Sequence, residues 1–227
     1  GDRVVHDSPV LAVSQDADGV EVTHVRHGRR ERMRADRVVL AVPFACLRHV
    51  HIAPALPAER VEAINGIRST SVTHVYVQFR QRAWESDPGR PAMVATDLPV
   101  GLVRDATYNQ PGPRGIIDSY SAGEDADWLS LLPEDQRVAA ALSSLEQVFP
   151  GIGQHHELGA SHSWGNDPWS RGDYAWYGPG DLTRHGPIAP LPVGRIHFAG
   201  DQTSPWPAWQ EGAIFSGHRA AMEIHRA

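Results

Sequence analysis

Apolar and polar positions alternate over short segments at the start of the chain, and this pattern predicts a β-meander. Val10–Val13 is a short apolar run, and residues 20–22 alternate in the way typical of a half-buried strand. Two turns separate the predicted strands, one at residues 16–19, where Gly19 is free to adopt a positive φ, and one at His27–Gly28. A polar strand follows the second turn.

Two further elements are predicted before residue 70. Val38–Val42 is apolar on both faces, which indicates a central strand, and Pro43 ends it because proline cannot donate to a strand ladder. Pro57–Ile64 predicts a short helix that begins near its proline and has Val61 and Ile64 on one side.

The middle of the chain predicts an antiparallel sheet and one long helix. Val72–Phe79 alternates, so its side chains divide between two faces: Val75, Val77 and Phe79 on one, and His74, Tyr76 and Gln78 on the other. Gly101–Val103 and Gly115–Tyr120 predict two more strands of this sheet. Pro133–Phe149 predicts a helix, because apolar residues recur at helical spacing until Pro150–Gly151 ends the pattern.

The last third of the chain is rich in aromatic residues and ends in a strand and a helix. Five aromatic residues lie between Trp164 and Tyr177 in irregular sequence, which indicates either the wall of a ligand pocket or a loop packed on the core. Arg195–Asp201 predicts a short buried strand, and Ile214–Ala227 predicts a helix. One face of this helix carries almost no side chain, since it consists of Ala213, Gly217 and Ala220.

Composition limits the classes of function. The chain has 227 residues and a formal net charge of -6, whereas nucleic-acid-binding domains are usually strongly basic, so no nucleic-acid partner is expected. All 21 basic residues are arginine, and the single cysteine, Cys46, cannot form an internal disulfide. No apolar run is long enough for a transmembrane helix, so no membrane partner is expected. Thirteen histidines suggest metal chemistry, but neither H-E-x-x-H nor G-x-S-x-G occurs, and no metal site is predicted.

Several segments together resemble the flavin amine oxidases, a family that includes monoamine, polyamine and L-amino-acid oxidases. The segment from Phe198 through Trp209, followed by small residues to Ala221, is similar to the family's closing motif. Asp36–Pro43 resembles the strand that returns to the FAD-binding domain, and Val72–Trp84 resembles a strand of the substrate domain. Trp164, with the segment 167–174 that follows, is most similar to the L-amino-acid oxidase branch.

The resemblance implies an α+β (mixed α/β) fold. It would comprise the C-terminal part of a FAD/NAD(P)-binding Rossmann-like domain and an antiparallel-sheet substrate-binding domain with helices. Residues 1–45 would form the β-meander and the returning strand of the FAD-binding domain. Residues 46–190 would form the substrate-binding domain, and residues 191–227 the closing strand and helix of the FAD-binding domain.

The resemblance also implies a set of cofactor-binding residues. The backbone of Val10 would meet the adenine, and Gly200–Asp201 would lie at the ribityl–pyrophosphate region, where the family usually has glutamate. Trp209 would lie beside the flavin ring. A helix N-terminus attracts negative charge, which the pyrimidine edge of a reduced flavin carries. The backbone N–H groups expected to face that edge belong to Gly212, Ala213 and Ile214.

Three positions are implied to be catalytic: His74, Tyr120 and Trp209. His74 stands on the strand where the family usually carries a lysine that holds a water near flavin N5, and a neutral imidazole could hold the same water. Tyr120 matches a tyrosine that hydrogen-bonds the substrate carboxylate in L-amino-acid oxidases. The residues implied to line the substrate pocket are Trp164, Tyr174 and Ala208.

The implied reaction is oxidation of an L-amino acid: hydride transfer from the α-carbon to FAD N5, hydrolysis of the imino acid, and reduction of oxygen to hydrogen peroxide. The dinucleotide fingerprint G-x-G-x-x-G does not occur in the chain. We therefore expect an N-terminal FAD-binding chain of the same enzyme as a partner, unless the sequence is a fragment, and a homo-oligomer of the assembled enzyme. The alternatives are an amine oxidase acting on a non-acidic amine, and a non-catalytic scaffold without cofactor. The sequence does not indicate a compartment.

Overall fold

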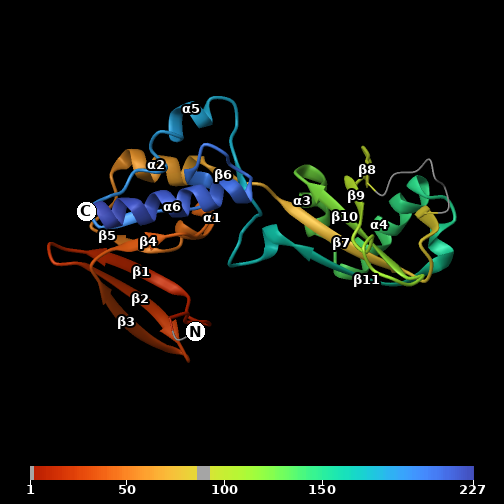
Figure 1. The fold of residues 1–227 in the computed structure, drawn as a ribbon, viewed down its shortest axis with the longest axis horizontal. Helices are drawn as coiled ribbons and strands as arrows, with labels where there is room; N and C mark the ends of the chain where they lie inside the picture. Colours follow the sequence, from red (N-terminus) through yellow and green to blue (C-terminus); the bar gives the residue numbers. More distant parts are fainter. Residues whose placement is uncertain (1–2, 86–92) are drawn as a thin grey trace. The chain divides into compact units, whose positions relative to one another are not determined.

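The structure is a computed structural model that describes residues 3–85 and 93–227. The chain divides into two compact units: unit 1 consists of Gly1–Ser69 and Tyr174–Ala227, and unit 2 of the residues 70–173 between them (Figure 1). The predicted substrate-binding domain, residues 46–190, is wider than unit 2. The reason is that residues 46–69 and 174–190 pack within unit 1, where helices α2 (Ala58–Gly66) and α5 (Asp181–His185) contact each other.

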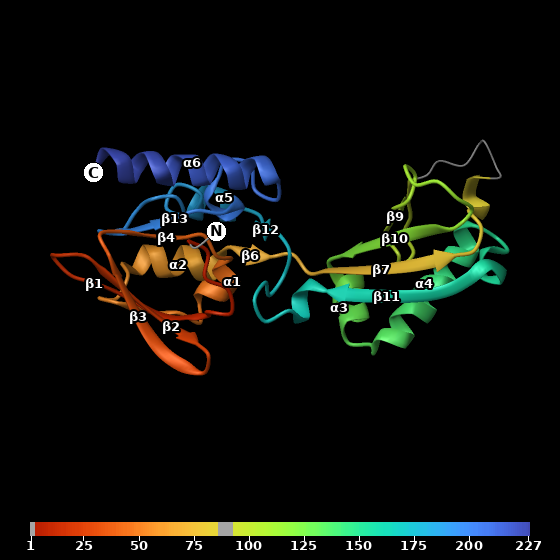
Figure 2. The same cartoon turned by 60° about the horizontal axis from the view of Figure 1, so that its bottom comes forward.

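The first sheet of unit 1 confirms the predicted meander (Figure 2). Its strand order is β3-β2-β1-β5, and its strands are β1 (Val10–Gln15), β2 (Val20–Arg26), β3 (Arg29–Ala35) and β5 (His51–Ala53). His27 and Gly28 both have positive φ in the β2–β3 turn. Gly19 does not have a positive φ. Glycine fits there for another reason, because an added Cβ would lie 2.6 Å from the Ala35 carbonyl oxygen.

A second, two-stranded sheet of unit 1 pairs β4 (Val38–Leu40) in parallel with β13 (Ile196–Phe198). The prediction of a central strand is wrong for the described residues of this chain, because β4 has β13 as its one neighbour there and Val39 and Val42 are exposed. All three residues of β13 are buried, as predicted.

The remaining elements of unit 1 are helices and a short strand pair. Unit 1 also contains α1 (Phe44–Leu47), α6 (Gln210–Arg226), the 3-10 helix η4 (Asp201–Thr203) and the strand pair β6 (Arg68–Ser69) and β12 (Ala175–Trp176). The buried side of α2 carries Ala63, Ile64 and, at 2 % exposure, Arg60, whereas Val61 is exposed. The expectation for Val61 is wrong because the long Arg60 side chain packs over the ring of Phe198, 4.3 Å from its centroid.

Unit 2 is a five-stranded antiparallel sheet in the order β11-β7-β10-β9-β8. Its strands are β7 (Val72–Phe79), β8 (Met93–Ala95), β9 (Leu102–Asp105), β10 (Gly115–Ala122) and β11 (His156–Ser163). Its helices are α3 (Glu124–Ser130) and α4 (Glu134–Val148), with the 3-10 helices η1 (Ala83–Glu85), η2 (Ile152–His155) and η3 (Trp164–Asn166). The predicted strands at β7, β9 and β10 and the predicted helix at α4 are confirmed.

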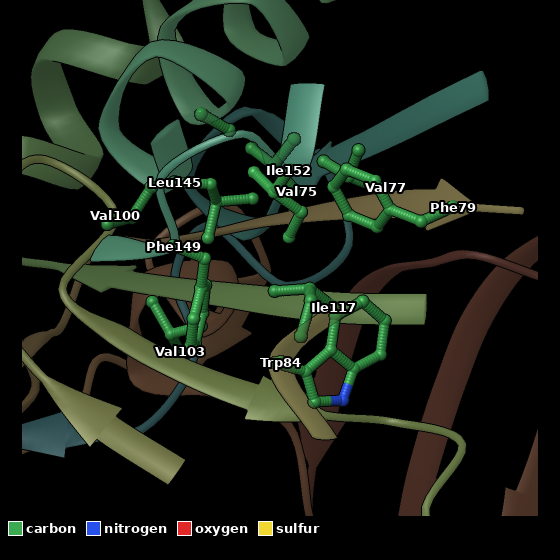
Figure 3. Packing of buried hydrophobic residues seen from close by; sticks show 11 residues of the cluster. Val75, Val77, Phe79, Trp84, Val100, Val103, Ile117, Leu145, Phe149 and Ile152 are labelled. Carbon is green, nitrogen blue, oxygen red and sulfur yellow. The ribbon is translucent and has the colours of Figure 1, made fainter. Parts of the chain in front are cut away.

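The core of unit 2 lies on the face of the sheet that α4 covers (Figure 3). The alternation of β7 is confirmed, since Val75, Val77 and Phe79 are buried and pack with Leu145 and other residues of the core. Together the two units confirm the expected mixed fold of helices and sheets. Within residues 3–85 and 93–227, no helix combines the length and the apolar character needed to cross a membrane.

Candidate cofactor and substrate site

The end of β13 is held against α6 by a glycine. Gly200 has φ 122° and donates its backbone N–H to Ser216 Oγ, 2.8 Å away. A side chain at Gly200 would collide with the Gln202 side-chain amide, 2.5 Å from the added Cβ. Positive φ and close packing therefore both favour glycine at this predicted cofactor-binding position.

Asp201 connects two segments of unit 1 through one carboxylate oxygen. Its Oδ2 accepts the backbone N–H of Ala175 at 2.8 Å and that of Ala208 at 3.0 Å. Ala208 has φ 70°, a left-handed conformation that costs an L-residue about 1–2 kcal/mol. The carboxylate thus fixes a strained loop residue directly before Trp209, and its predicted contact with FAD stays a prediction.

Helix α6 begins four residues earlier than predicted. Trp209 is its N-cap residue, and the Ala213 N–H donates to the Trp209 carbonyl at 3.2 Å. The first-turn N–H groups that have no acceptor inside the helix therefore belong to residues 210–212. Of the predicted trio, only Gly212 belongs to this turn, because the Ala213 N–H makes the first helical hydrogen bond and Ile214 follows it.

The small-residue face of α6 also differs from the prediction. The residues that α6 buries are Gly212, Ser216 and Ala220, while Ala213 and Gly217 are exposed. An added Cβ at Gly217 would meet no atom within 4 Å. Trp209, at 72 % exposure, and Ile214 are exposed near the same end of the helix.

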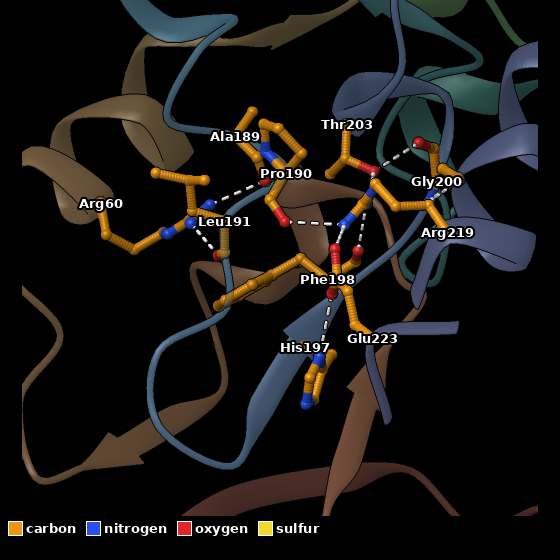
Figure 4. A network of polar contacts seen from close by, with 11 residues as sticks. Arg60, Ala189, Pro190, Leu191, His197, Phe198, Gly200, Thr203, Arg219 and Glu223 are labelled. Atoms are coloured by element: carbon orange, nitrogen blue, oxygen red, sulfur yellow. Dashed lines mark hydrogen bonds and ion pairs between the residues drawn. The ribbon is translucent and has the colours of Figure 1, made fainter. Parts of the chain in front are cut away.

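Two arginines and an acid–histidine pair hold β13 in place (Figure 4). Arg219 Nη2 donates to the Phe198 carbonyl at 2.7 Å, and its Nη1 donates to Glu223 Oε1 at 2.7 Å. His197 Nδ1 lies 3.0 Å from Glu223 Oε2. Arg60 donates to the backbone carbonyls of Ala189 and Leu191. These contacts fix the strand from which Gly200 and Asp201 continue.

Glu223 gives a pH dependence of stability. Burial raises the pKa of Glu223, but hydrogen bonds from His197 and Arg219 outweigh it and lower the pKa below its ordinary value of 4.5. The stabilisation is therefore present above the unfolded-state pKa and is lost as pH falls through the lower folded-state pKa. We expect Glu223→Gln to be less stable than wild type at pH 7. In urea unfolding, the difference in unfolding free energy should narrow as pH falls below about 4, the ordinary range of carboxyl pKa values. A gap that stays constant over this range would contradict the assignment.

In unit 2, the structure brings the predicted residues His74 and Tyr120 together. They are direct cross-strand partners on β7 and β10, and their rings meet edge to face with centroids 5.1 Å apart. They lie on the sheet face opposite the core, because the alternating neighbours Thr73 and Val75 are buried.

Sequence reasoning missed two charged residues on this face. Asp118 Oδ1 lies 2.8 Å from His74 Nδ1, and Asp118 Oδ2 lies 2.5 Å from Arg104 Nη2. The Arg104 guanidinium also lies over the Tyr120 ring, 5.3 Å from its centroid. The available signal was the alternation of β10, which puts Asp118 and Tyr120 on the same face.

The remaining predicted residues lie in both units. Trp164, in η3 of unit 2, packs edge to face on His162, with ring centroids 4.4 Å apart, and His162 is the β11 partner of His74. Tyr174 and Ala208 belong to unit 1. Val10 is exposed on β1, in the meander of unit 1. Asp201, Ala208, Trp209 and Gly212 therefore lie at or just before the start of α6, and His74 and Tyr120 lie on the outer face of the unit 2 sheet. Val10 belongs to neither group.

Comparisons with known proteins give the family. Residues 1–225 match the model of the flavin-containing amine oxidoreductases. The chain is 29 % identical over 232 residues to the putative L-amino-acid oxidase YobN of Bacillus subtilis, covering 99 % of this chain and 48 % of that protein. It is 30 % identical over 238 residues to the flavin-containing amine oxidase A of Equus caballus, and the match covers 100 % of this chain and 43 % of that protein.

Similarity to a solved structure supports the same family. A triple mutant of putrescine oxidase, redesigned in its cofactor binding, has a TM-score of 0.88 and 28 % identity, and the match covers 100 % of this chain and 50 % of that one. The chain spans about half the length of the curated relatives it matches. The family model over nearly the whole chain and the shared fold confirm the resemblance, and FAD is the cofactor it implies. The chain belongs to the family of flavin-containing amine oxidoreductases.

Proposed function

We propose that this chain supplies the flavin-ring part and the substrate-binding part of an FAD-dependent L-amino-acid oxidase. The observation that carries the proposal is the start of α6, where an exposed aromatic ring, Trp209, adjoins a helical turn with free N–H groups. A planar, partly anionic ring system is the ligand that such a site favours.

The residues at this site fit FAD. The exposed face of Trp209 offers a stacking surface, and the turn 210–212 offers N–H donors to a negative pyrimidine edge. The open space beside Gly217 would allow a flat group to approach the helix closely. When bound, FAD would supply the redox chemistry, as the acceptor of two electrons from the substrate.

The chain's own residues would bind and orient the substrate. Within unit 1, Trp209 would offer an aromatic wall to the substrate, and Tyr174 and Ala208 would contact it. The Tyr120 hydroxyl would donate a hydrogen bond to the substrate carboxylate, and His74 would hold a water or a proton near the reacting nitrogen. Fixing these groups on strands reduces the entropy lost on reaching the reactive geometry.

We propose an N-terminal FAD-binding chain of the same enzyme as the partner. The support is the exposure of apolar residues on unit 1, at Val10 and Leu11 on β1 and at Val39 and Val42 on and after β4. Within the described residues β4 pairs with β13 alone, so it can accept a further strand.

The second candidate is an amine oxidase acting on a non-acidic amine. The amine oxidase A and putrescine oxidase relatives support it. Tyr120 favours the amino acid, because its hydroxyl suits a carboxylate. Peroxide release with L-amino acids, compared with the matching amines that lack the carboxylate, separates the two candidates.

The visible spectrum of the native protein, recorded beside a denaturing gel, tests the proposal. We expect flavin absorption and a second band from the N-terminal chain. A colourless single chain that stays colourless when FAD and the candidate N-terminal chain are added would contradict the proposed function.

His74→Lys tests the position of His74. Lysine would add the positive charge that favours reaction of the reduced enzyme with oxygen, so we expect flavin reoxidation to accelerate roughly tenfold, equivalent to about 1.4 kcal/mol. His27→Lys makes the same change in the exposed β2–β3 turn, which is remote from His74 in the sequence, and should leave the rate of flavin reoxidation unchanged. An unchanged reoxidation rate in His74→Lys would mean that His74 is not near flavin N5.

A further inference from the structure

One cluster of polar residues in unit 2 includes side chains that have no role in the proposed function. It lies on the outer face of the sheet, and we call it the His74 cluster. Its members come from β7, β9 and β10 and are His74, Tyr76, Arg104, Asp118 and Tyr120. His74 and Asp118 are largely buried, with side-chain exposures of 14 % and 8 %.

The contacts of Asp118 determine which form of His74 is present. Arg104 Nη2 lies 2.5 Å from Asp118 Oδ2, so the Asp118 carboxylate accepts a charge-assisted hydrogen bond. An ionised carboxylate can only accept hydrogen bonds. The 2.8 Å contact between His74 Nδ1 and Asp118 Oδ1 therefore requires the proton on Nδ1. In neutral His74, the lone pair that remains free to accept a proton is then on Nε2.

Neighbouring rings restrict the imidazole in this orientation. Tyr76 stacks on His74 with an interplanar angle of 4° and a centroid distance of 5.5 Å, and Tyr120 packs against the ring edge to face. The Tyr76 hydroxyl lies 3.3 Å from Nδ1, farther than Asp118. Burial raises the pKa of Tyr76, Asp118 acts in the same direction and Arg104 opposes it, so the hydroxyl is neutral near pH 7. From β11, His162 faces His74 as its cross-strand partner.

We propose that Asp118 is a positioning residue that fixes His74 in the Nδ1–H form, so that His74 Nε2 accepts a proton from the substrate ammonium group. The inference rests on the proposed function and deepens it. An amine is oxidised only after its nitrogen lone pair is free, so one proton must leave the ammonium nitrogen first. That proton moves to Nε2, the N–H bond electrons stay on the substrate nitrogen, and the Asp118 carboxylate offsets the new imidazolium charge.

The tautomer of His74 tests this inference without flavin. In nitrogen-15 NMR of the purified chain, with His74→Gln used for assignment, we expect neutral His74 to carry its proton on Nδ1. A proton found mainly on Nε2 in the wild-type chain overturns the proposal. In Asp118→Asn we expect the Nδ1–H form of neutral His74 to lose its preference, because the carboxylate that accepts this proton is gone. Asp105→Asn is the matched control. Asp105 lies on the neighbouring strand and bonds to Trp84 Nε1, not to His74.

The flavin-loaded enzyme gives the second readout. We expect the acid limb of kcat/KM in Asp118→Asn to move about one unit towards lower pH, while Asp105→Asn leaves it in place. If Asp118→Asn binds flavin and the acid limb of its kcat/KM does not move, the positioning role is overturned and the proposed function stands. Failure of every preparation to bind flavin overturns the proposed function, and the tautomer measurement still decides the state of His74.

Discussion

Gly212→Ala is expected to destabilise the chain by about 3 kcal/mol, at the upper end of the range for overpacking. An added Cβ would overlap the Trp206 carbonyl oxygen and Ser204 Oγ. A backbone carbonyl cannot turn aside as a flexible side chain does, so the first turn of α6 must shift. Urea unfolding measures the loss, and flavin binding by the assembled enzyme should weaken with it.

Gly217→Ala is the matched control on the same helix. Because an added Cβ there meets nothing within 4 Å, alanine should stabilise the isolated chain by about 1 kcal/mol through its higher helix propensity. In the assembled enzyme the gain should disappear if FAD or the N-terminal chain covers this side. Equal effects of the two substitutions on the isolated chain would show that neither site packs as described.

Arg60→Ala is expected to cost about 4 kcal/mol of unfolding free energy. The substitution leaves a cavity beside Phe198 and removes the donors for the carbonyls of Ala189 and Leu191. Burial, with Arg219 acting in the same direction and Glu59 opposing, lowers the pKa of Arg60 to about 10, so the side chain stays charged at neutral pH. Its hydrogen bonds to carbonyls are what compensate that buried charge.

Two further variants separate the contributions at Arg60. Arg60→Met keeps much of the volume but no donor, so it should lose about 2 kcal/mol. Arg184→Ala removes an exposed arginine of α5 that pairs with Glu62 on α2, the helix that carries Arg60, and it should lose less than about 1 kcal/mol. If Arg60→Ala were no more harmful than Arg184→Ala in urea unfolding, the buried network around Phe198 would not stabilise unit 1.

The sequence predicted the elements whose apolar spacing is strong. Val75, Val77 and Phe79 on β7 gave a correct strand and a correct buried face. Strand β11 was missed, because Leu158 is exposed and its neighbours are small or polar, so no alternation of apolar residues marks it. The first turn of α6 was missed because it contains Gly212, and glycine has a low helix propensity. Its packing against Ser204 and Trp206 is a tertiary contact that helix propensity does not describe.

The sequence predicted several residues of the candidate site, but not how those residues are arranged. The family resemblance identified His74, Tyr120 and Trp209, and the structure pairs the first two across β7 and β10. Asp118 and Arg104 were missed because charge pairing between strands depends on register, which a single sequence does not fix here. Arg60 was missed because a buried arginine is rare and its acceptors, Ala189 and Leu191, lie far along the chain.

The division of unit 1 into two separate stretches of chain has a consequence for biosynthesis. Unit 2 is continuous, so the ribosome delivers all of it before the strand that completes the β4 sheet has been made. Val38 cannot form its strand pairing until Ile196 has been synthesised. Closing so long a loop is slow and costs conformational entropy. Unit 2 can therefore fold during translation, whereas unit 1 reaches its native pairing only after β13 has been synthesised. Until then, β4 and the buried side of α2 lack the partners that cover them in the native fold.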